Sequence, residues 1–204
     1  IQTMKDVKFI LLDKTGTITK GKPALTDLIP SENAKEKELL TTAASLESAS
    51  EHPLARAIVD AAKNKKIKLE KISKFKILRG RGVEAIIKGK KAIIGNRRLM
   101  QEEKIDIKDA EKKLSELENQ GKTAMIVATN KKILGIIGVA DTLKDESAEA
   151  IAELNRIGFK TIMITGDNER TANAIAKSVG IEEVMANVLP EEKENKVKEL
   201  QKRG

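Results

Sequence analysis

The sequence predicts an α/β protein in which a doubly wound parallel sheet carries an inserted α+β unit built on an antiparallel sheet. Three observations lead to this fold class. A short buried strand, "VKFILLD" (7–13), comes early in the chain and ends on an aspartate. Helix and strand patterns alternate from about residue 145 onward, as they do in parallel α/β sheets. Between these two parts, short alternating segments over 74–95 are typical of antiparallel strands.

Two helices are expected in the first part of the insertion. After Pro23 comes a polar link, and a first helical pattern covers about 33–48. A second pattern covers about 53–64 and is opened by "SEHP", with Ser50 as its expected cap. Pro53 lies in the first turn of this helix, where its missing N–H removes no hydrogen bond.

Strands, one helix and two hairpins are expected in the middle of the chain. Gly89-Lys90 between two apolar segments is a hairpin signal, and "NKK" separates a second pair of such segments. The expected elements are strands at 74–80, 82–88 and 91–95, a helix at about 97–119 that stops near Gly121, and strands at 123–129 and 133–141.

The C-terminal part alternates between helices and strands. Gly158 and Gly180 stand where the C-caps of two of these helices belong. The expected elements are helices at about 145–157, 169–179 and 191–203, and buried strands at 160–165 and 183–188. We therefore expect one domain from residues 1–25 and 121–204, which holds the parallel sheet, and an inserted domain from residues 26–120.

The composition excludes several kinds of site. There is no cysteine and one histidine, His52, so disulfides, thiolate metal sites and histidine clusters are excluded. The net charge is +8, but lysines alternate with glutamates in stretches such as "KEKELL", a pattern of solvated helix faces. With three Phe and no Trp or Tyr available for base stacking, no nucleic-acid partner is expected. No apolar run approaches the roughly 20 residues that span a bilayer, so the chain as given is expected to be soluble.

Two predicted strands of the parallel sheet end beside an aspartate. "LLDKTGT" carries Asp13 and "MITGDN" carries Asp167, and ligands bind at the carboxyl ends of parallel strands. Two carboxylates with hydroxyls and backbone N–H groups beside them suit a phosphate with Mg²⁺, because N–H groups hold phosphate oxygens and carboxylates hold Mg²⁺. Asp13 is a candidate metal ligand and a candidate nucleophile for a phosphoryl group. For each aspartate taken alone, the alternative is a turn or cap role.

Thr15 and Lys193 add to this hypothesis. Thr15 stands two residues after Asp13, where a carboxylate could act as acid or base and help water attack an acyl phosphate. With a threonine there, an aspartyl phosphate is expected to persist, which suits a machine that uses the intermediate to drive motion. Lys193 in "LPEEKENKV" opens the last helix and could neutralise the phosphate, the alternative being a solvated charge.

With its motifs in their order along the sequence, the chain resembles the cytoplasmic catalytic part of heavy-metal-transporting P-type ATPases. The catalytic domain of that family belongs to the haloacid dehalogenase superfamily. "DKTGTITKGKP" is similar to the phosphorylation motif of that family, and "TGDN" and "LPEEKENKV" are similar to its other phosphate-site motifs. The segments similar to its nucleotide-binding motifs are "ESASEHPLARAI" (47–58), "GRGV" (80–83) and "GNRRLM" (95–100). "ADTLK" (140–144) is similar to the segment that returns to the catalytic domain, so the resemblance covers nearly the whole chain.

The resemblance implies a haloacid-dehalogenase-like, Rossmann-like phosphorylation domain with an inserted nucleotide-binding domain, and ATP and Mg²⁺ as cofactors. Asp13 would be phosphorylated and would bind Mg²⁺. Thr15 would contact the phosphate and give a backbone carbonyl to Mg²⁺, and Lys193 would balance the charge. The phosphoryl oxygens and the nucleotide tail would be bound by Thr165, Gly166 and Asp167. The adenine and the rest of the nucleotide would be held by Glu47, His52, Gly80, Gly82, Asn96 and Arg97.

The resemblance also implies that this chain is part of a larger protein. Besides ATP, its partners would be the transmembrane and actuator domains of a pump, and it would lie at the cytoplasmic face of the cell membrane. The family's Gly-Asp-Gly-x-Asn-Asp motif, whose aspartate completes the Mg²⁺ site, does not appear before the sequence stops. We therefore expect a C-terminally clipped phosphorylation domain that binds ATP and has little activity alone.

The expected function is phosphorylation of Asp13 by ATP to drive a heavy-metal pump, with copper as the first choice and zinc, cadmium or cobalt as alternatives. A stand-alone phosphatase of the same superfamily is the main alternative. Thr15 and the adenine-site insertion speak against it. A non-catalytic nucleotide-binding module and a potassium-pumping relative are two further alternatives.

Overall fold

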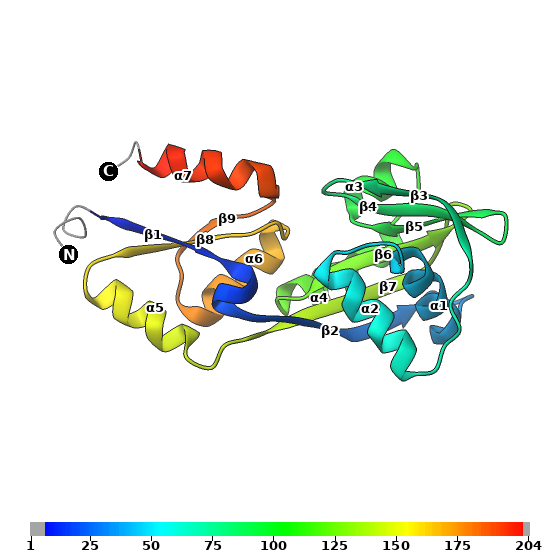
Figure 1. Cartoon of the computed structure of the whole chain (residues 1–204), viewed down its shortest axis with the longest axis horizontal. Coiled ribbons are helices and arrows are strands. Elements are labelled where there is room, and N and C mark those ends of the chain that lie inside the picture. Colours follow the sequence, from blue (N-terminus) through cyan, green and yellow to red (C-terminus); the bar gives the residue numbers. More distant parts are fainter. Residues whose placement is uncertain (1–6, 202–204) are drawn as a thin grey trace. The chain divides into compact units, whose positions relative to one another are not determined.

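The computed structural model describes residues 7–201 of the chain, which form two compact units (Figure 1). The first unit contains the chain up to Gly21, residues 119–121 and the chain from Asp141 onward. The second contains Lys22–Glu118 and Lys122–Ala140. These bounds differ from those of the expected domains, because the hairpin expected in the parallel-sheet domain pairs within the antiparallel sheet of the second unit.

The first unit is built on a parallel sheet with the strand order β1-β8-β9. Residues of its two central helices pack with the sheet in one apolar cluster, which includes Ile151, Met163 and Ile175. The strands are β1 (Phe9–Asp13), β8 (Lys160–Ile164) and β9 (Glu183–Met185), and the helices are α5 (Ser147–Arg156), α6 (Glu169–Val179) and α7 (Lys193–Gln201). The predicted parallel sheet is confirmed. Its third strand is shorter than the expected 183–188, and residues 202–203 of the expected last helix lie outside the described residues.

The start and end of α6 follow the signals in the sequence. The Asn168 side chain accepts a hydrogen bond from the Thr171 N–H at 3.1 Å, which caps the helix start. Gly180 adopts the left-handed conformation with φ 81°, and Gly158 does so after α5 with φ 99°. Both glycines therefore end their helices as predicted.

The second unit is built on a six-stranded sheet with the order β2-β7-β6-β5-β4-β3. The pairs from β3 to β7 are antiparallel. The strands are β2 (Thr19–Pro30), β3 (Ile72–Leu78), β4 (Gly82–Ile87), β5 (Lys90–Gly95), β6 (Thr123–Thr129) and β7 (Lys132–Leu143). The helices are α1 (Glu36–Glu47), α2 (Pro53–Asn64), α3 (Arg97–Glu102) and α4 (Lys108–Asn119).

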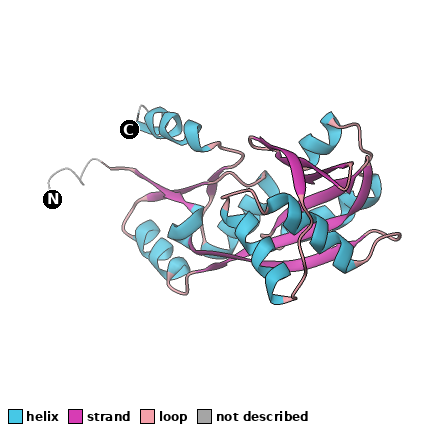
Figure 2. Cartoon of the chain, turned by 45° about the vertical axis from the view of Figure 1, so that its right-hand side comes forward, coloured by secondary structure: helices cyan, strands magenta, loops and turns pink. Residues whose placement is uncertain are grey.

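Apolar side chains on both faces of this sheet explain its two helical layers (Figure 2). In β5, Ala92 and Ile94 belong to the core under α1 and α2, while Ile93 belongs to the core under α3 and α4. In β6, Val127 and Ile126 divide in the same way. Since successive side chains of a strand point to opposite faces, each strand contributes to both cores.

Three expectations for the second unit are wrong. The polar link after Pro23 is part of the long strand β2, which the glycine and proline in its first half hid from the pattern. The helix expected at 97–119 is two helices, because Lys104 takes φ 56° and the chain turns so that Ile105 becomes buried. The β4–β5 turn is formed by Lys88 and Gly89, with φ 50° and 76°, rather than by Gly89-Lys90.

The predicted hairpin around "NKK" is confirmed, with Asn130 and Lys131 at φ 48° and 62° between β6 and β7. No helix within residues 7–201 combines the length and the apolar character needed to cross a membrane.

Glu47, the last residue of α1, is a buried carboxyl group that is 7% exposed. Burial raises the pKa of this carboxyl to about 7, against the opposing effect of a hydrogen bond from the Ser50 side chain. The cause is that the carboxylate form loses in the folded protein the hydration that it has in the unfolded chain.

We expect Glu47 to lower the stability of the chain as the pH rises toward neutrality. Its folded-state pKa of about 7 lies above the ordinary 4.5, so the folded protein binds this proton more tightly, and the free energy of unfolding falls between those two pH values. The expected loss is about 3 kcal/mol, since one pKa unit corresponds to roughly 1.4 kcal/mol. Urea unfolding at about pH 5 and about pH 8 measures it. Glu47→Gln should remove this difference and the exposed Glu51→Gln should keep it, whereas a Glu47→Gln protein with the wild-type pH dependence would contradict the burial argument.

Candidate functional site

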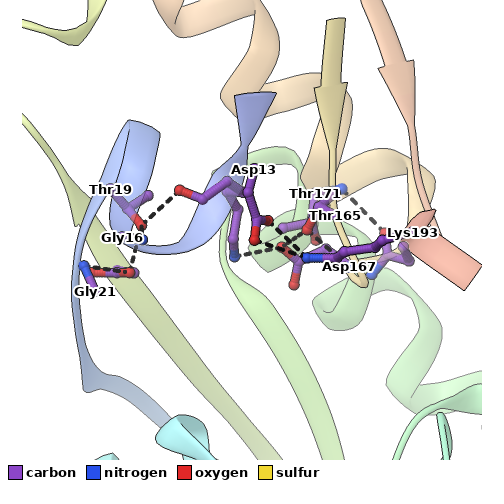
Figure 3. A network of polar contacts seen from close by, with 11 residues as sticks. Asp13, Gly16, Thr19, Gly21, Thr165, Asp167, Thr171 and Lys193 are labelled. Atoms are coloured by element: carbon purple, nitrogen blue, oxygen red, sulfur yellow. Dashed lines mark hydrogen bonds and ion pairs between the residues drawn. The ribbon is translucent and has the colours of Figure 1, made fainter. Parts of the chain in front are cut away.

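The carboxyl edge of the parallel sheet brings together the predicted phosphate-site residues of the first unit (Figure 3). Asp13 is the last residue of β1 and lies opposite Ile164, the last residue of β8. The turn 165–167 follows β8 directly. Its backbone is anchored by two hydrogen bonds, from the Thr165 N–H to the Met185 carbonyl at 2.9 Å and from the Asn187 N–H to the Asp167 carbonyl at 2.8 Å. The parallel register therefore places Asp13 and this turn at the same edge.

Lys193 contacts Asp13 directly. Its Nζ donates to both carboxylate oxygens of Asp13, at 2.9 Å each (Figure 3). Lys193 is the first residue of α7 and follows a short 3₁₀ turn at Pro190–Glu192. The start of the helix therefore sets the backbone position of Lys193. The Asp13 side chain is 43% exposed and that of Lys193 is 32% exposed. Since ion pairs so open to water are weak, a ligand can displace this one at small cost.

A second lysine–aspartate pair lies deeper at the same edge. Lys14 forms an ion pair with Asp167, and the two side chains are 10% and 9% exposed. The Thr165 hydroxyl also donates to Asp167 at 3.0 Å and accepts from the Asp167 N–H at 3.1 Å. The carboxylate of Asp167 is therefore held in one place by a charge and a hydroxyl. We did not predict a role for Lys14, although a lysine directly after a buried strand needs a carboxylate partner.

The chain makes a wide turn over Lys14–Ile18, directly after Asp13. Thr15 is exposed in it, and Gly16 takes φ 78°. The turn is anchored by Thr19, which is fully buried and whose hydroxyl donates to the Asp141 carboxylate at 2.6 Å. The Gly16 N–H donates to the Thr19 hydroxyl at 3.3 Å. Thr19 and Asp141 lie in the quoted motifs, but their pairing joins segments more than a hundred residues apart, so the spacing gave no signal for it.

The donor set of this edge fits Mg²⁺ in type. Within residues 7–201, no group of three or more acidic or histidine side chains could hold a metal ion. Asp13 offers a carboxylate and Thr15 a backbone carbonyl, and Mg²⁺ prefers such oxygen ligands. Mg²⁺ is also commonly bound by one or two carboxylates together with water and substrate phosphates. These residues therefore fit a Mg²⁺ ion that arrives with a phosphate group.

In the second unit, His52 caps α2. Its Nδ1 accepts a hydrogen bond from the Leu54 N–H at 3.2 Å, and Pro53 is the first helical residue. The expectation that Ser50 is the cap is wrong, because Ser50 instead accepts from the His52 N–H, at 3.4 Å. The buried Glu47 is the last residue of α1, just before the segment that leads to His52. Glu47 and His52 therefore flank the short connection between α1 and α2.

Gly80, Gly82 and Asn96 form a second group in this unit. The Asn96 side chain donates to the Gly80 carbonyl at 2.8 Å and accepts from the Leu99 N–H at 3.2 Å, which caps α3. Gly82 has a structural reason of its own, because a Cβ there would lie 2.0 Å from the Ile94 carbonyl oxygen. Both features shape the chain where the turn between β3 and β4 lies beside the end of β5.

Arg97 is engaged on α4. Its guanidinium donates to the carboxylates of Glu111 and Glu118, and the Glu118 side chain is 1% exposed. These charge-assisted bonds neutralise a buried carboxylate, so Arg97 has a structural function in this state. A pocket of about 290 Å³, lined in part by Lys91, Ile93 and Ile105, contains none of the predicted site residues.

Comparisons with known proteins show the family to which the chain belongs. A family model described as haloacid dehalogenase-like hydrolase matches residues 7–204. The copper-exporting P-type ATPase of Staphylococcus saprophyticus is 49% identical over 201 residues, which are 98% of this chain and 25% of that protein. The chain spans about a quarter of the length of the curated relatives it matches.

Solved structures of P-type ATPases are also similar to this chain. A crystal structure of a zinc-transporting PIB-type ATPase in the E2.Pi state is similar with a TM-score of 0.63 and 38% identity, over 97% of this chain and 32% of that one. The catalytic domain of a CPx-ATPase, from a study of conformational changes upon nucleotide binding, has a TM-score of 0.74 and 26% identity, over 100% of this chain and 70% of that one. The predicted fold class is confirmed.

The resemblance to heavy-metal-transporting P-type ATPases is thus confirmed, and the chain belongs to the haloacid dehalogenase-like hydrolase family.

Proposed function

We propose that this chain is the ATP-binding and phosphoryl-accepting part of a copper pump, in which phosphorylation of Asp13 drives transport by the whole protein. The contact of Lys193 with both oxygens of Asp13, at an open carboxyl edge, is the observation that carries the proposal. Similarity to a copper-exporting P-type ATPase at 49% identity supports copper as the ion and export as the direction. The pump's transmembrane and actuator domains would be its partners, and this part would lie on the cytoplasmic face of the cell membrane.

The reaction is transfer of the γ-phosphoryl group of ATP to the Asp13 carboxylate. An oxygen of Asp13 forms a bond to the γ-phosphorus while the bond from that phosphorus to the β–γ bridging oxygen breaks, and ADP leaves with the electron pair. The ammonium of Lys193 lies beside the accepting atoms, where it stabilises negative charge on the transferring group. Asp13 and the Thr15 carbonyl would hold a Mg²⁺ ion, which would supply further positive charge to the phosphate oxygens.

The other residues of the edge hold this arrangement. Lys14 and Thr165 fix Asp167, and the Gly166 N–H of the turn 165–167 would donate to a phosphate oxygen. Thr15 stands where a phosphatase of this superfamily would use a second carboxylate, so water attack on the acyl phosphate is slow. This favours the pump over a stand-alone phosphatase.

We assign nucleotide binding to the second unit. Glu47, at the end of α1, and His52, at the start of α2, would hold the adenine, while Gly80, Gly82 and Asn96 would shape the neighbouring backbone. Arg97 is the weakest member of the predicted set, because its guanidinium is occupied by two glutamates.

Asp13→Asn should abolish the acid-stable phosphoenzyme that forms from radiolabelled ATP in a full-length pump containing this chain, because an amide cannot accept the phosphoryl group. Lys193→Ala should slow its formation by about 100-fold, the usual effect of removing one group that stabilises transition-state charge. Asp145→Asn and Lys196→Ala, two surface changes, serve as controls and should behave as wild type. Label that persists in Asp13→Asn would refute the mechanism.

His52→Asn should weaken ATP binding without Mg²⁺ by about tenfold or more, which corresponds to roughly 1.4 kcal/mol. Asparagine is a good helix cap, so this change removes the imidazole while α2 stays capped. Calorimetric titration of the chain measures the affinity, and thermal unfolding checks that the cap survives. Equal ATP affinity in wild type and His52→Asn would remove the adenine assignment.

A further inference from the structure

The residues predicted to bind the nucleotide in the second unit offer little positive charge to its phosphates. Phosphate groups in proteins are commonly bound by arginine or lysine side chains. Arg97 is the one such residue in the predicted set of this unit, and its guanidinium is engaged by Glu111 and Glu118. Among the predicted residues of this unit, no arginine or lysine is therefore left for the phosphate chain of ATP.

Arg79, in the turn between β3 and β4, differs from the other cations around that turn. It is exposed, and its side chain makes no hydrogen bond or ion pair with any residue within 7–201. Its neighbour Arg81, by contrast, lies 2.6 Å from Glu102. The pairs that engage the neighbouring cations are Lys76–Glu84, Arg81–Glu102, Arg98–Glu102, Arg97–Glu111 and Arg97–Glu118. The guanidinium of Arg79 is thus available to an anionic ligand.

The turn that carries Arg79 is held in one conformation. The Arg81 N–H donates to the Leu78 carbonyl at 2.9 Å, which closes a four-residue turn with Gly80 at φ 67°. Asn96 holds this turn at two points, because its side chain donates to the Gly80 carbonyl at 2.8 Å and its N–H donates to the Arg81 carbonyl at 2.9 Å. The backbone next to Arg79 is therefore fixed by residues of the predicted nucleotide set.

The positive charge of the chain is concentrated in the segment that ends at this turn. Residues 63–81 contain nine lysines and arginines and one glutamate, so their net charge of +8 equals that of the whole chain. A region of this charge raises the local concentration of an anion such as ATP. Arg79 lies at the end of the segment that adjoins the predicted nucleotide residues, whereas Lys74 lies further from the turn along β3.

We propose that Arg79 is the phosphate-binding cation of the second unit and holds the phosphate chain of ATP beside Gly80 and Gly82. The proposal rests on the proposed function, which assigns the adenine to Glu47 and His52. A guanidinium suits this role because it stays charged and its N–H donors can bind two phosphate oxygens at once. The glycines, which have no side chain, let a ligand approach the backbone closely.

The test compares ATP with AMP, since AMP keeps the adenine and the ribose but has one phosphate. His52 is the single histidine of the chain, so its ring signals in an NMR titration report occupancy of the adenine site by either ligand. Arg79→Met should weaken the binding of ATP without Mg²⁺ by roughly five- to tenfold and that of AMP much less, because AMP lacks most of the phosphate charge. Arg79→Lys should recover part of the loss.

Lys74→Met is the matched control. It removes the same charge from an exposed position of the same strand, so it should leave the affinity for both ligands close to that of the wild type. Salt gives a second check. The difference between wild type and Arg79→Met should shrink at 1 M salt, where charges are screened over about 3 Å.

The outcomes separate the proposal from the proposed function. Wild-type ATP affinity in Arg79→Met would overturn the proposal. Equal weakening of ATP and AMP would also overturn it, because Arg79 would then shape the turn and not bind phosphate. If Lys74→Met weakens ATP binding as much as Arg79→Met, a diffuse positive field replaces the specific contact. If neither ligand shifts the His52 signals of the wild type, the proposed function of this unit fails, and the proposal falls with it.

Discussion

Two lysine–aspartate pairs define the carboxyl edge of the parallel sheet, and each pair joins distant parts of the chain. Asp13 pairs with Lys193 of α7. Lys14, the residue that follows Asp13 in the sequence, pairs with Asp167. The pairs keep two carboxylates oriented where two parallel strands end, because a charge at a half-buried edge needs a partner. Two positive and two negative charges balance there. A phosphate group that binds at this edge must therefore replace Asp13 as the partner of Lys193. Because the Lys193–Asp13 pair is exposed, breaking it costs less free energy than breaking the buried Lys14–Asp167 pair.

The turn after Asp13 depends on a second long-range contact. The Asp141 carboxylate accepts from the Thr19 hydroxyl at 2.6 Å and from the Gly21 N–H at 3.1 Å. These residues lie where β2 and β7 each pass from one compact unit to the other. A single carboxylate thus fastens both connecting strands and, through the bond from Gly16 to Thr19, the turn that follows the proposed phosphorylation site. Thr19 and Asp141 therefore hold both the turn that follows Asp13 and the strands β2 and β7 at this point.

The sequence was most informative where local chemistry decides the structure. Helix α2 agrees with its predicted span because proline opens it, and α6 because Gly180 ends it. Periodicity failed where tertiary burial overrides it, as at Ile105, whose burial breaks the expected single helix. The placement of Asp13, Asp167 and Lys193 at one edge could be predicted, since parallel strands align their ends. The partners of Lys14 and Asp141 could not, because the contacts join segments more than a hundred residues apart. The roles of these residues toward ATP stay predictions.

The proposed mechanism requires that the Asp13 carboxylate, opposed by Lys193, accepts a phosphoryl group. Beryllofluoride with Mg²⁺ forms a stable mimic of an acyl phosphate on a carboxylate, and ¹⁹F spectra of the chain report its binding directly. We predict a protein-bound ¹⁹F signal that disappears in Asp13→Asn, weakens in Lys193→Met and is unchanged in the surface variant Lys196→Met. An identical bound signal in Asp13→Asn would contradict this mechanism, because the fluoride complex would then be held by some other group.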